Sequence, residues 1–189
     1  MAEKAEPDSV WRERVEAILE ATGDVPFGAY EVPSPYKRLL TPEMMRWAAQ
    51  TGRFVFLKDT SCDVEAIAAK CAAIEGSPFR LFNAHVPILV EAIERHADGF
   101  CGIAGNAYPN IVAYATHHAL EPGKAQKAQE FLTRNEKRLG MAYPLTAKIL
   151  ARMDGVQIEP VCRKKSKPLN AEQMRILSDV HREAEALLS

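Results

Sequence analysis

The chain has 189 residues, with 24 Lys and Arg against 25 Asp and Glu, so its formal net charge at neutral pH is −1. Hydrophobic residues make up 47% of the chain, a composition that excludes disorder over most of its length. The near-zero charge gives no electrostatic reason to expect a nucleic-acid partner, and no apolar run approaches the roughly 20 residues that cross a bilayer, so we expect no membrane contact. With a polar start and four cysteines that form no Cys-x-x-Cys pair, we expect a cytoplasmic chain without a disulfide framework or a zinc site.

The first hundred residues predict helices that alternate with short apolar strands. Apolar residues recur at helical spacing in four segments and form short runs bounded by turn residues in four others. The expected helices are 11–21, 42–51, 61–75 and 86–96, and the expected strands are 25–30, 54–58, 79–82 and 99–103. Such alternation favours right-handed strand–helix–strand units, which build a parallel sheet.

The remaining residues predict helices only. Three helical segments are expected at about 108–120, 124–139 and 141–153, and a last helix is expected to begin at Asn170. Asn170 is a favourable N-cap, and Gln173 is spaced to reach back as in a capping box. Thr41 is the other clear helix start, because proline and an acidic residue follow it.

Lys58 closes the most apolar strand of the chain. Ligands of parallel α/β proteins bind at the carboxyl ends of strands, which is where this lysine is expected. A partly desolvated amine at such a position can attack a carbonyl group and form a Schiff base. From strand position alone, a lysine that reaches into solvent or pairs with Asp59 is the favoured interpretation, because ion pairs are common.

Tyr30 closes the neighbouring strand and shares a face with Gly28, which leaves space beside the ring. A phenol there can relay protons to and from a carbinolamine. The other interpretation is an amphipathic core residue with its hydroxyl at the rim of the sheet.

These residues belong to an ordered set of motifs that resembles the dihydrodipicolinate synthase/N-acetylneuraminate lyase family. The resemblance begins with Tyr-Glu-Val-Pro at 30–33 and Phe-Leu-Lys-Asp-Thr-Ser at 56–61. The step of 28 residues between the tyrosine and the lysine (58 − 30) is similar to that between the family's catalytic tyrosine and Schiff-base lysine. The resemblance continues through the segments 97–99, 105–109 and 143–148, and it covers the chain from about Trp11 to the C-terminus.

The resemblance implies an α/β fold of the (β/α)8 TIM-barrel type, here about four C-terminal units followed by helices. The implied organisation is a polar tail at 1–8, half of a barrel at 9–107 and a helical region at 108–189. Lys58 would form a Schiff base with pyruvate or a related 2-oxo acid, and Tyr30 would relay protons. The implied activity is that of a lyase or aldolase, which forms or cleaves a carbon–carbon bond with an aldehyde or sugar-acid co-substrate, or dehydrates a keto-deoxy sugar acid. No metal or other cofactor is implied.

The chain departs from the family pattern in three places. The family's four earlier strands, with their carboxylate-binding loop, have no counterpart, so we expect a homo-oligomer or pairing with a missing N-terminal half-barrel. Dihydrodipicolinate synthases carry an arginine soon after the tyrosine, and the equivalent position in this chain is Pro35. Lys37 and Arg38 are the candidates to replace that arginine. The family's Gly-(Asp/Asn)-Asp segment reads Asn-Ala-His at 83–85.

Four further residues are candidates for substrate binding because they follow the ends of expected strands. Asn83 and His85 follow the third strand, and Gly102 and Ile103 end the fourth. His85 fits an exposed loop histidine as well as a substrate contact. An alternative of a different class is an inactive half-barrel fragment that acts only as an assembly or interaction partner.

Overall fold

The computed structural model describes residues 5–163 and 167–188. The chain divides into two compact units, Met1–Gly99 and Phe100–Ser189. Residues 1–4 of the expected polar tail lie outside the described residues, and the first helix already begins at Asp8. In the described part of the chain, no helix has the length and apolar character that a bilayer crossing requires.

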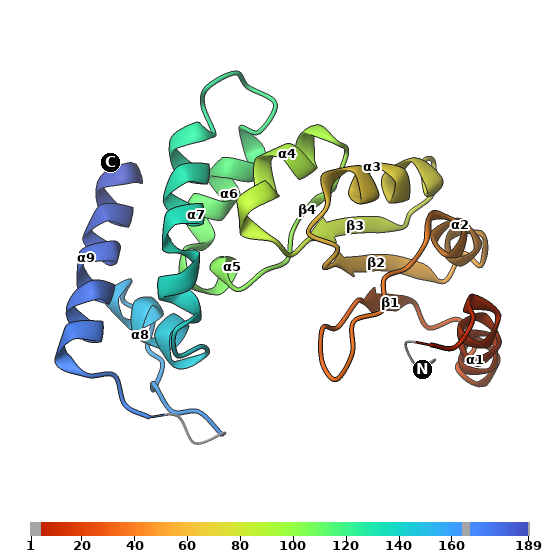
Figure 1. The fold of residues 1–189 in the computed structure, drawn as a ribbon, viewed down its shortest axis with the longest axis horizontal. Coiled ribbons are helices and arrows are strands. Elements are labelled where there is room, and N and C mark those ends of the chain that lie inside the picture. Colours follow the sequence, from red (N-terminus) through yellow and green to blue (C-terminus); the bar gives the residue numbers. More distant parts are fainter. Residues whose placement is uncertain (1–4, 164–166, 189) are drawn as a thin grey trace. The chain divides into compact units, whose positions relative to one another are not determined.

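The first unit builds a parallel sheet and its helices, as the sequence predicts (Figure 1). Its strands follow one another in the order β1-β2-β3-β4. The strands are β1 (Phe27–Tyr30), β2 (Phe54–Asp59), β3 (Arg80–Asn83) and β4 (Gly99–Phe100), where the unit ends. The helices are α1 (Asp8–Ala21), α2 (Pro42–Gln50), α3 (Val64–Ala73), the 3-10 helix η1 (Val86–Ile88) and α4 (Leu89–Glu94).

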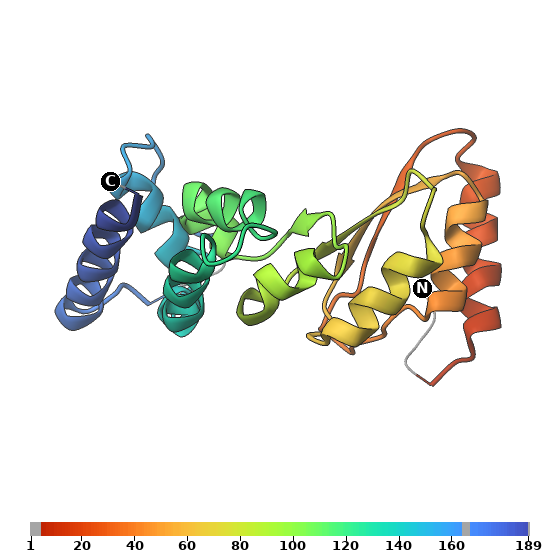
Figure 2. The same cartoon turned by 90° about the horizontal axis from the view of Figure 1, so that it is seen from above.

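The two faces of this sheet differ in what covers them. Leu57 and Leu81, paired in register, are fully buried in the core that α1, α2 and α3 supply from one side of the strands (Figure 2). The opposite face, which we call the open face, carries Gly28, Tyr30, Phe56, Lys58 and Phe82. Alternation produces this division along β3 and along β2 from Phe56 onward, because successive side chains point to opposite faces. At the start of β2 the pairing with β1 skips Val55, and Phe54 lies in the helix-covered core.

Two aromatic rings and a glycine shape the open face. The rings of Phe56 and Phe82 stack with their centroids 5.0 Å apart. A Cβ atom on Gly28 would lie 3.2 Å from the Phe56 ring, and one on Gly99 would lie 2.9 Å from the Phe82 ring. The glycines therefore leave the room in which the two rings lie against the sheet.

The helices of the first unit begin and pack as their sequences indicate. The Thr41 hydroxyl accepts a hydrogen bond from the Met44 N–H at 3.2 Å, which confirms the predicted N-cap of α2. Helix α1 packs on α2 through Trp11 and Trp47, whose rings meet edge to face at 5.7 Å.

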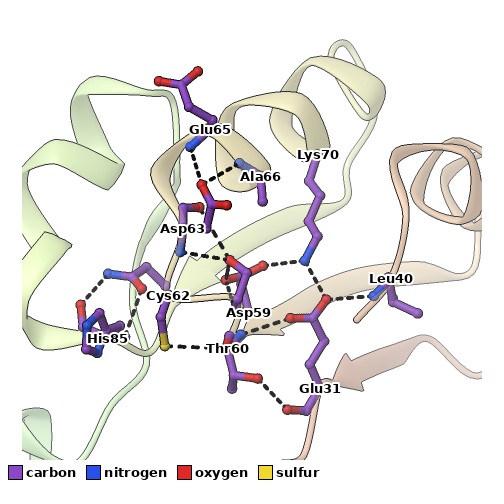
Figure 3. A network of polar contacts seen from close by, with 12 residues as sticks. Glu31, Leu40, Asp59, Thr60, Cys62, Asp63, Glu65, Ala66, Lys70 and His85 are labelled. Atoms are coloured by element: carbon purple, nitrogen blue, oxygen red, sulfur yellow. Dashed lines mark hydrogen bonds and ion pairs between the residues drawn. The ribbon is translucent and has the colours of Figure 1, made fainter. Parts of the chain in front are cut away.

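A buried ion-pair network lies on the helix-covered face, at the last residue of β2 and the first residue after β1. The Lys70 ammonium, on α3, donates to Glu31 Oε1 and to Asp59 Oδ2, both at 2.5 Å (Figure 3). All three residues are buried, with exposed fractions of 2% or less. The charges are thus satisfied inside the protein rather than by water, which is the condition under which buried charges are tolerated.

Backbone groups complete the network around both carboxylates. Glu31 accepts from the N–H of Leu40 at 2.8 Å and from that of Thr60 at 2.9 Å. Asp59 accepts from the backbone N–H and the hydroxyl of Ser61 at 2.9 and 2.7 Å. Burial raises the pKa of the Glu31 carboxyl above its ordinary value, and Lys70 counters this rise only in part.

The second unit is helical. It contains α5 (Ala104–Ala107), α6 (Pro109–His117), α7 (Gln126–Gly140), α8 (Leu145–Met153) and α9 (Ala171–Leu188). Asn170 and Gln173 exchange two hydrogen bonds of 3.0 and 2.8 Å, which confirms the capping box before α9.

The strand expected at 99–103 is shorter than predicted. It ends at Phe100, because the chain turns at Gly102 and Ile103, whose carbonyls accept from the N–H groups of Gly105 and Asn106 at 3.1 Å. These bonds between residues three apart start α5 where the apolar run suggested an extended chain.

The network makes a specific prediction for Lys70→Met. Removing the ammonium leaves two carboxylates buried without a counter-charge, so the free energy of unfolding at pH 7 should fall by about 3–5 kcal/mol. A carboxyl whose pKa is higher in the folded than in the unfolded protein destabilises the fold only above its unfolded pKa. The difference in the free energy of unfolding between parent and variant should therefore grow as the pH rises from about 4.5, the ordinary pKa of a Glu, and should be smallest at acidic pH. Urea unfolding of the parent and the variant between pH 4.5 and 8 measures it. A deficit that does not depend on pH would contradict the buried-charge explanation.

Candidate functional site

Tyr30 and Lys58 meet on the open face. They are register partners in the pair β1–β2, so their side chains leave the sheet on the same side. The Lys58 Nζ atom lies 4.4 Å from the centroid of the Tyr30 ring, in the position of a cation–π contact. The two residues singled out from the sequence are therefore in direct contact, and half of the Tyr30 surface is exposed.

Lys58 does not form the ion pair with Asp59 that the sequence left open. The Asp59 carboxylate points to the other face of the sheet, where it pairs with Lys70. Within 5–163 and 167–188, no carboxylate lies within ion-pair distance of the Lys58 ammonium. A half-buried amine flanked by Tyr30 and Phe82, without a carboxylate partner, is the kind of group that can react with a carbonyl compound.

Asn83 ends β3 and is committed to the loop that follows. Its amide nitrogen donates to the His85 carbonyl, and its amide oxygen accepts from the His85 N–H, both at 2.8 Å. These bonds fix the turn at the end of β3, where Asn83 itself is buried. The Asn83 side chain lies on the same face as Asp59, its register partner, and so opposite Lys58. A role for Asn83 or His85 in substrate binding stays a prediction.

The other candidate residues belong to the second unit. Gly102 and Ile103 form the turn into α5, and their role in substrate binding also stays a prediction. In the same unit, Asn106 donates from Nδ2 to the Tyr143 hydroxyl at 2.9 Å. These two residues come from the segments 105–109 and 143–148, so two distant parts of the motif set are in contact.

An apolar cavity of about 420 Å³ lies between α1, β1 and the loop that follows β1. Trp11, Phe27 and Tyr36 contribute to its lining, and Arg38 reaches its rim. The Arg38 guanidinium donates to the Glu6 carbonyl at 2.7 Å and to the Asp8 carboxylate at 2.6 Å. Arg38 therefore ties the start of α1 to this loop, and Lys37 is the other basic side chain there.

Sequence reasoning missed Lys70, the partner of Asp59, and Glu31, the second carboxylate that Lys70 binds. A signal for both was present. Glu31 and Asp59 each follow one of the candidate catalytic residues, and Lys70 lies three residues after Ile67 and one before Cys71, within the apolar stripe of α3. A charged residue in a stripe that is otherwise buried indicates a buried counter-charge.

A resident metal ion has no evident ligand set in the described part of the chain. No three His, Cys, Asp or Glu side chains are grouped there in a way that would hold one. The candidate site is thus a contact between an amine and a phenol on an apolar sheet face.

Known proteins resemble this chain in structure rather than in sequence. No family model and no curated protein matches the sequence. A monomeric dihydrodipicolinate synthase variant superposes with a TM-score of 0.81 and 18% identity, over 97% of this chain and 62% of its own. Dihydrodipicolinate synthase DapA-2 of Bacillus anthracis superposes with a TM-score of 0.80 and 22% sequence identity, over 95% of this chain and 62% of its own. A third structure is the pyruvate complex of a prophage protein of E. coli K12 that belongs to the dihydrodipicolinic acid synthase family. It superposes with a TM-score of 0.79 and 15% sequence identity, over 96% of this chain and 63% of its own.

The coverage is unequal in the same way for all three structures. Almost all of this chain matches, but the chain spans less than two thirds of the length of each structure. This agrees with the expectation of a partial barrel with helices after it. The chain therefore has the fold of part of the (β/α)8 barrel of dihydrodipicolinate synthase-type proteins, together with the helices that follow the barrel.

Proposed function

We propose that this chain is the Schiff-base-forming part of a lyase or aldolase that acts on pyruvate or a related 2-oxo acid. The observation that carries the proposal is the contact between Lys58 and Tyr30 at the carboxyl ends of adjacent parallel strands. The likeness to solved structures of the dihydrodipicolinate synthase family supports it, and the prophage protein of that family is solved in complex with pyruvate.

Lys58 is the nucleophile in the proposed reaction. Its unprotonated Nζ attacks the carbonyl carbon of the 2-oxo acid, and a proton moves from nitrogen to oxygen to give a carbinolamine. The hydroxyl then takes up a proton and leaves as water, and carbon and nitrogen form an iminium. The iminium accepts the electron pair that remains when the neighbouring carbon loses a proton, and the resulting enamine attacks the aldehyde carbon of the co-substrate. Cleavage is the same sequence in reverse.

Tyr30 is the proton relay. Its phenol donates the proton with which the carbinolamine hydroxyl leaves, and it takes a proton back in a later step. The co-substrate is an aldehyde or a sugar acid, and dehydration of a keto-deoxy sugar acid uses the same iminium.

The proposed enzyme needs cover for its open face. Parallel sheets are normally buried on both faces, and β1 and β4 end the sheet order in the described chain. We propose that a second copy, or a chain that supplies the remaining strands, covers this face. The same exposed face also favours the second candidate function, an inactive half-barrel that serves only in assembly.

Borohydride trapping tests the nucleophile. The folded chain, incubated with pyruvate and reduced, should gain one pyruvyl group by intact mass, and Lys58→Ala should gain none. Lys127→Ala, which removes an exposed lysine of α7, is the matched control and should react like the parent. An adduct of equal yield in Lys58→Ala would place the reactive amine elsewhere, and a folded parent without adduct would favour the assembly role.

Tyr30→Phe tests the relay while keeping the ring under the Lys58 amine. The rate of adduct formation should fall by about 100-fold, in the range typical of a lost acid–base group. The matched control is Tyr114→Phe, which removes a hydroxyl from a partly exposed tyrosine of α6. An unchanged trapping rate in Tyr30→Phe would mean that water, and not the phenol, moves the protons.

Sedimentation tests the cover for the open face. If a second copy provides it, the parent should sediment with a mass above that of the 21.0 kDa chain. Phe82→Lys should shift it towards the monomer, because a charge would then have to be buried in the interface. Val161→Lys, at an exposed site of the second unit, controls for added charge. A parent that remains monomeric at every concentration would exclude a second copy and leave a separate chain as the cover.

A further inference from the structure

We infer that Lys70 is a positioning residue for Tyr30 and Lys58: through Glu31 and Asp59 it holds the ends of β1 and β2 so that the amine stays over the ring. The inference rests on the proposed function for what the pair does, but the position of the pair can be measured without it. Nothing in the chemistry of the reacting groups requires Lys70, which lies on the opposite side of the sheet.

The first step of the argument is the alternation of side chains. Tyr30 and Lys58 point to the open face, and the next residue on each strand, Glu31 or Asp59, points to the helices. Each reactive residue is therefore one peptide bond away from a carboxylate of the network. A shift of either carboxylate moves the neighbouring Cα atom, and with it the side chain on the other face.

The second step is where the backbone ladder stops. The Glu31 N–H donates to the Lys58 carbonyl at 3.2 Å, one residue after the end of β1 at Tyr30. This backbone hydrogen bond lies at the end of the ladder between β1 and β2. Beyond it the strands are joined by side chains. The Thr60 N–H and hydroxyl donate to the Glu31 carboxylate and carbonyl at 2.9 and 2.6 Å, and Lys70 bridges Glu31 to Asp59.

The third step is the rigidity of the bridge. The Lys70 stem comes from the last turn of α3, a helix capped at its start by Asp63, whose carboxylate accepts from two N–H groups of the first turn (Figure 3). Lys70 binds two carboxylates from two strands at once, so it fixes their separation as well as their register. A charged contact that is fully buried has few other geometries to adopt, since any other would leave a charge unpaired.

The test reads the Lys58–Tyr30 contact directly. Lysines of the full chain are reductively methylated with 13C-formaldehyde, and the Lys58 signal is assigned by its absence in Lys58→Ala. Because the Lys58 Nζ lies over the Tyr30 ring, its methyl signals should be shifted upfield of those of exposed lysines. Lys70→Met should lose most of this shift. A dimethylated Lys58 can no longer form a Schiff base, so trapping is measured on the unmethylated proteins, where Lys70→Met should lower the maximal rate of pyruvate trapping on the order of 10- to 100-fold, as expected when reacting groups are misplaced by about an ångström.

A stability-matched control separates positioning from general destabilisation. Ile67→Ala removes a fully buried side chain three residues before Lys70 on α3, outside the network. It should lower stability by a similar amount while keeping the shift and the trapping rate. If Lys70→Met does not fold, Glu31→Gln takes its place. This variant keeps the Lys70–Asp59 ion pair, but only a neutral amide then links the end of β1 to Lys70. Part of the upfield shift should therefore be lost.

The outcomes are distinct for the two proposals. Loss of the upfield shift in folded Lys70→Met or Glu31→Gln, with the shift kept in Ile67→Ala, supports the positioning role even if the parent forms no pyruvate adduct. In that case only the proposed function fails. An unchanged shift in the folded network variants, or an equal loss in Ile67→Ala, overturns the positioning role whatever the trapping experiment shows.

Discussion

The first unit is organised around one buried ammonium between two carboxylates. Lys70, Glu31 and Asp59 come from a helix and two strands that are distant in sequence, and their charges can be satisfied only when all three elements are in place. Misplacing any of them would leave a charge buried and unpaired, at a cost of several kcal/mol. The network therefore makes the native arrangement of α3, β1 and β2 specific, whereas apolar packing alone tolerates more variation.

The sheet presents different chemistry on its two faces, and the ion-pair network occupies only one of them. The helix-covered face holds a fixed set of buried charges. The open face holds an amine, a phenol and a stacked aromatic pair, with glycines where bulk would interfere. Adjacent residues in the sequence thus separate into a supporting layer and a reactive layer, which is possible because a strand sends alternate side chains to opposite sides.

Much of this could be predicted from the sequence where the signals are local. The Thr41 cap and the Asn170–Gln173 capping box follow from spacing within a few residues, and the parallel strands follow from their alternation with helices. The partner of Asp59 was missed although Lys70 lies within the apolar stripe of α3, because Lys58 is the nearer lysine in the sequence and the choice of Lys70 depends on how α3 packs on the sheet. The short β4 was missed for a related reason: an apolar run fits a strand or a buried helix start equally well.

The edge-to-face contact of Trp11 with Trp47 has a consequence of a different kind. These are the chain's two tryptophans, and both belong to the first unit. Indole emission therefore reports on the sheet-bearing unit alone, whereas the helical signal in circular dichroism comes from both units. Comparing the two signals during denaturation would show whether the units melt together or one after the other, without any label being introduced.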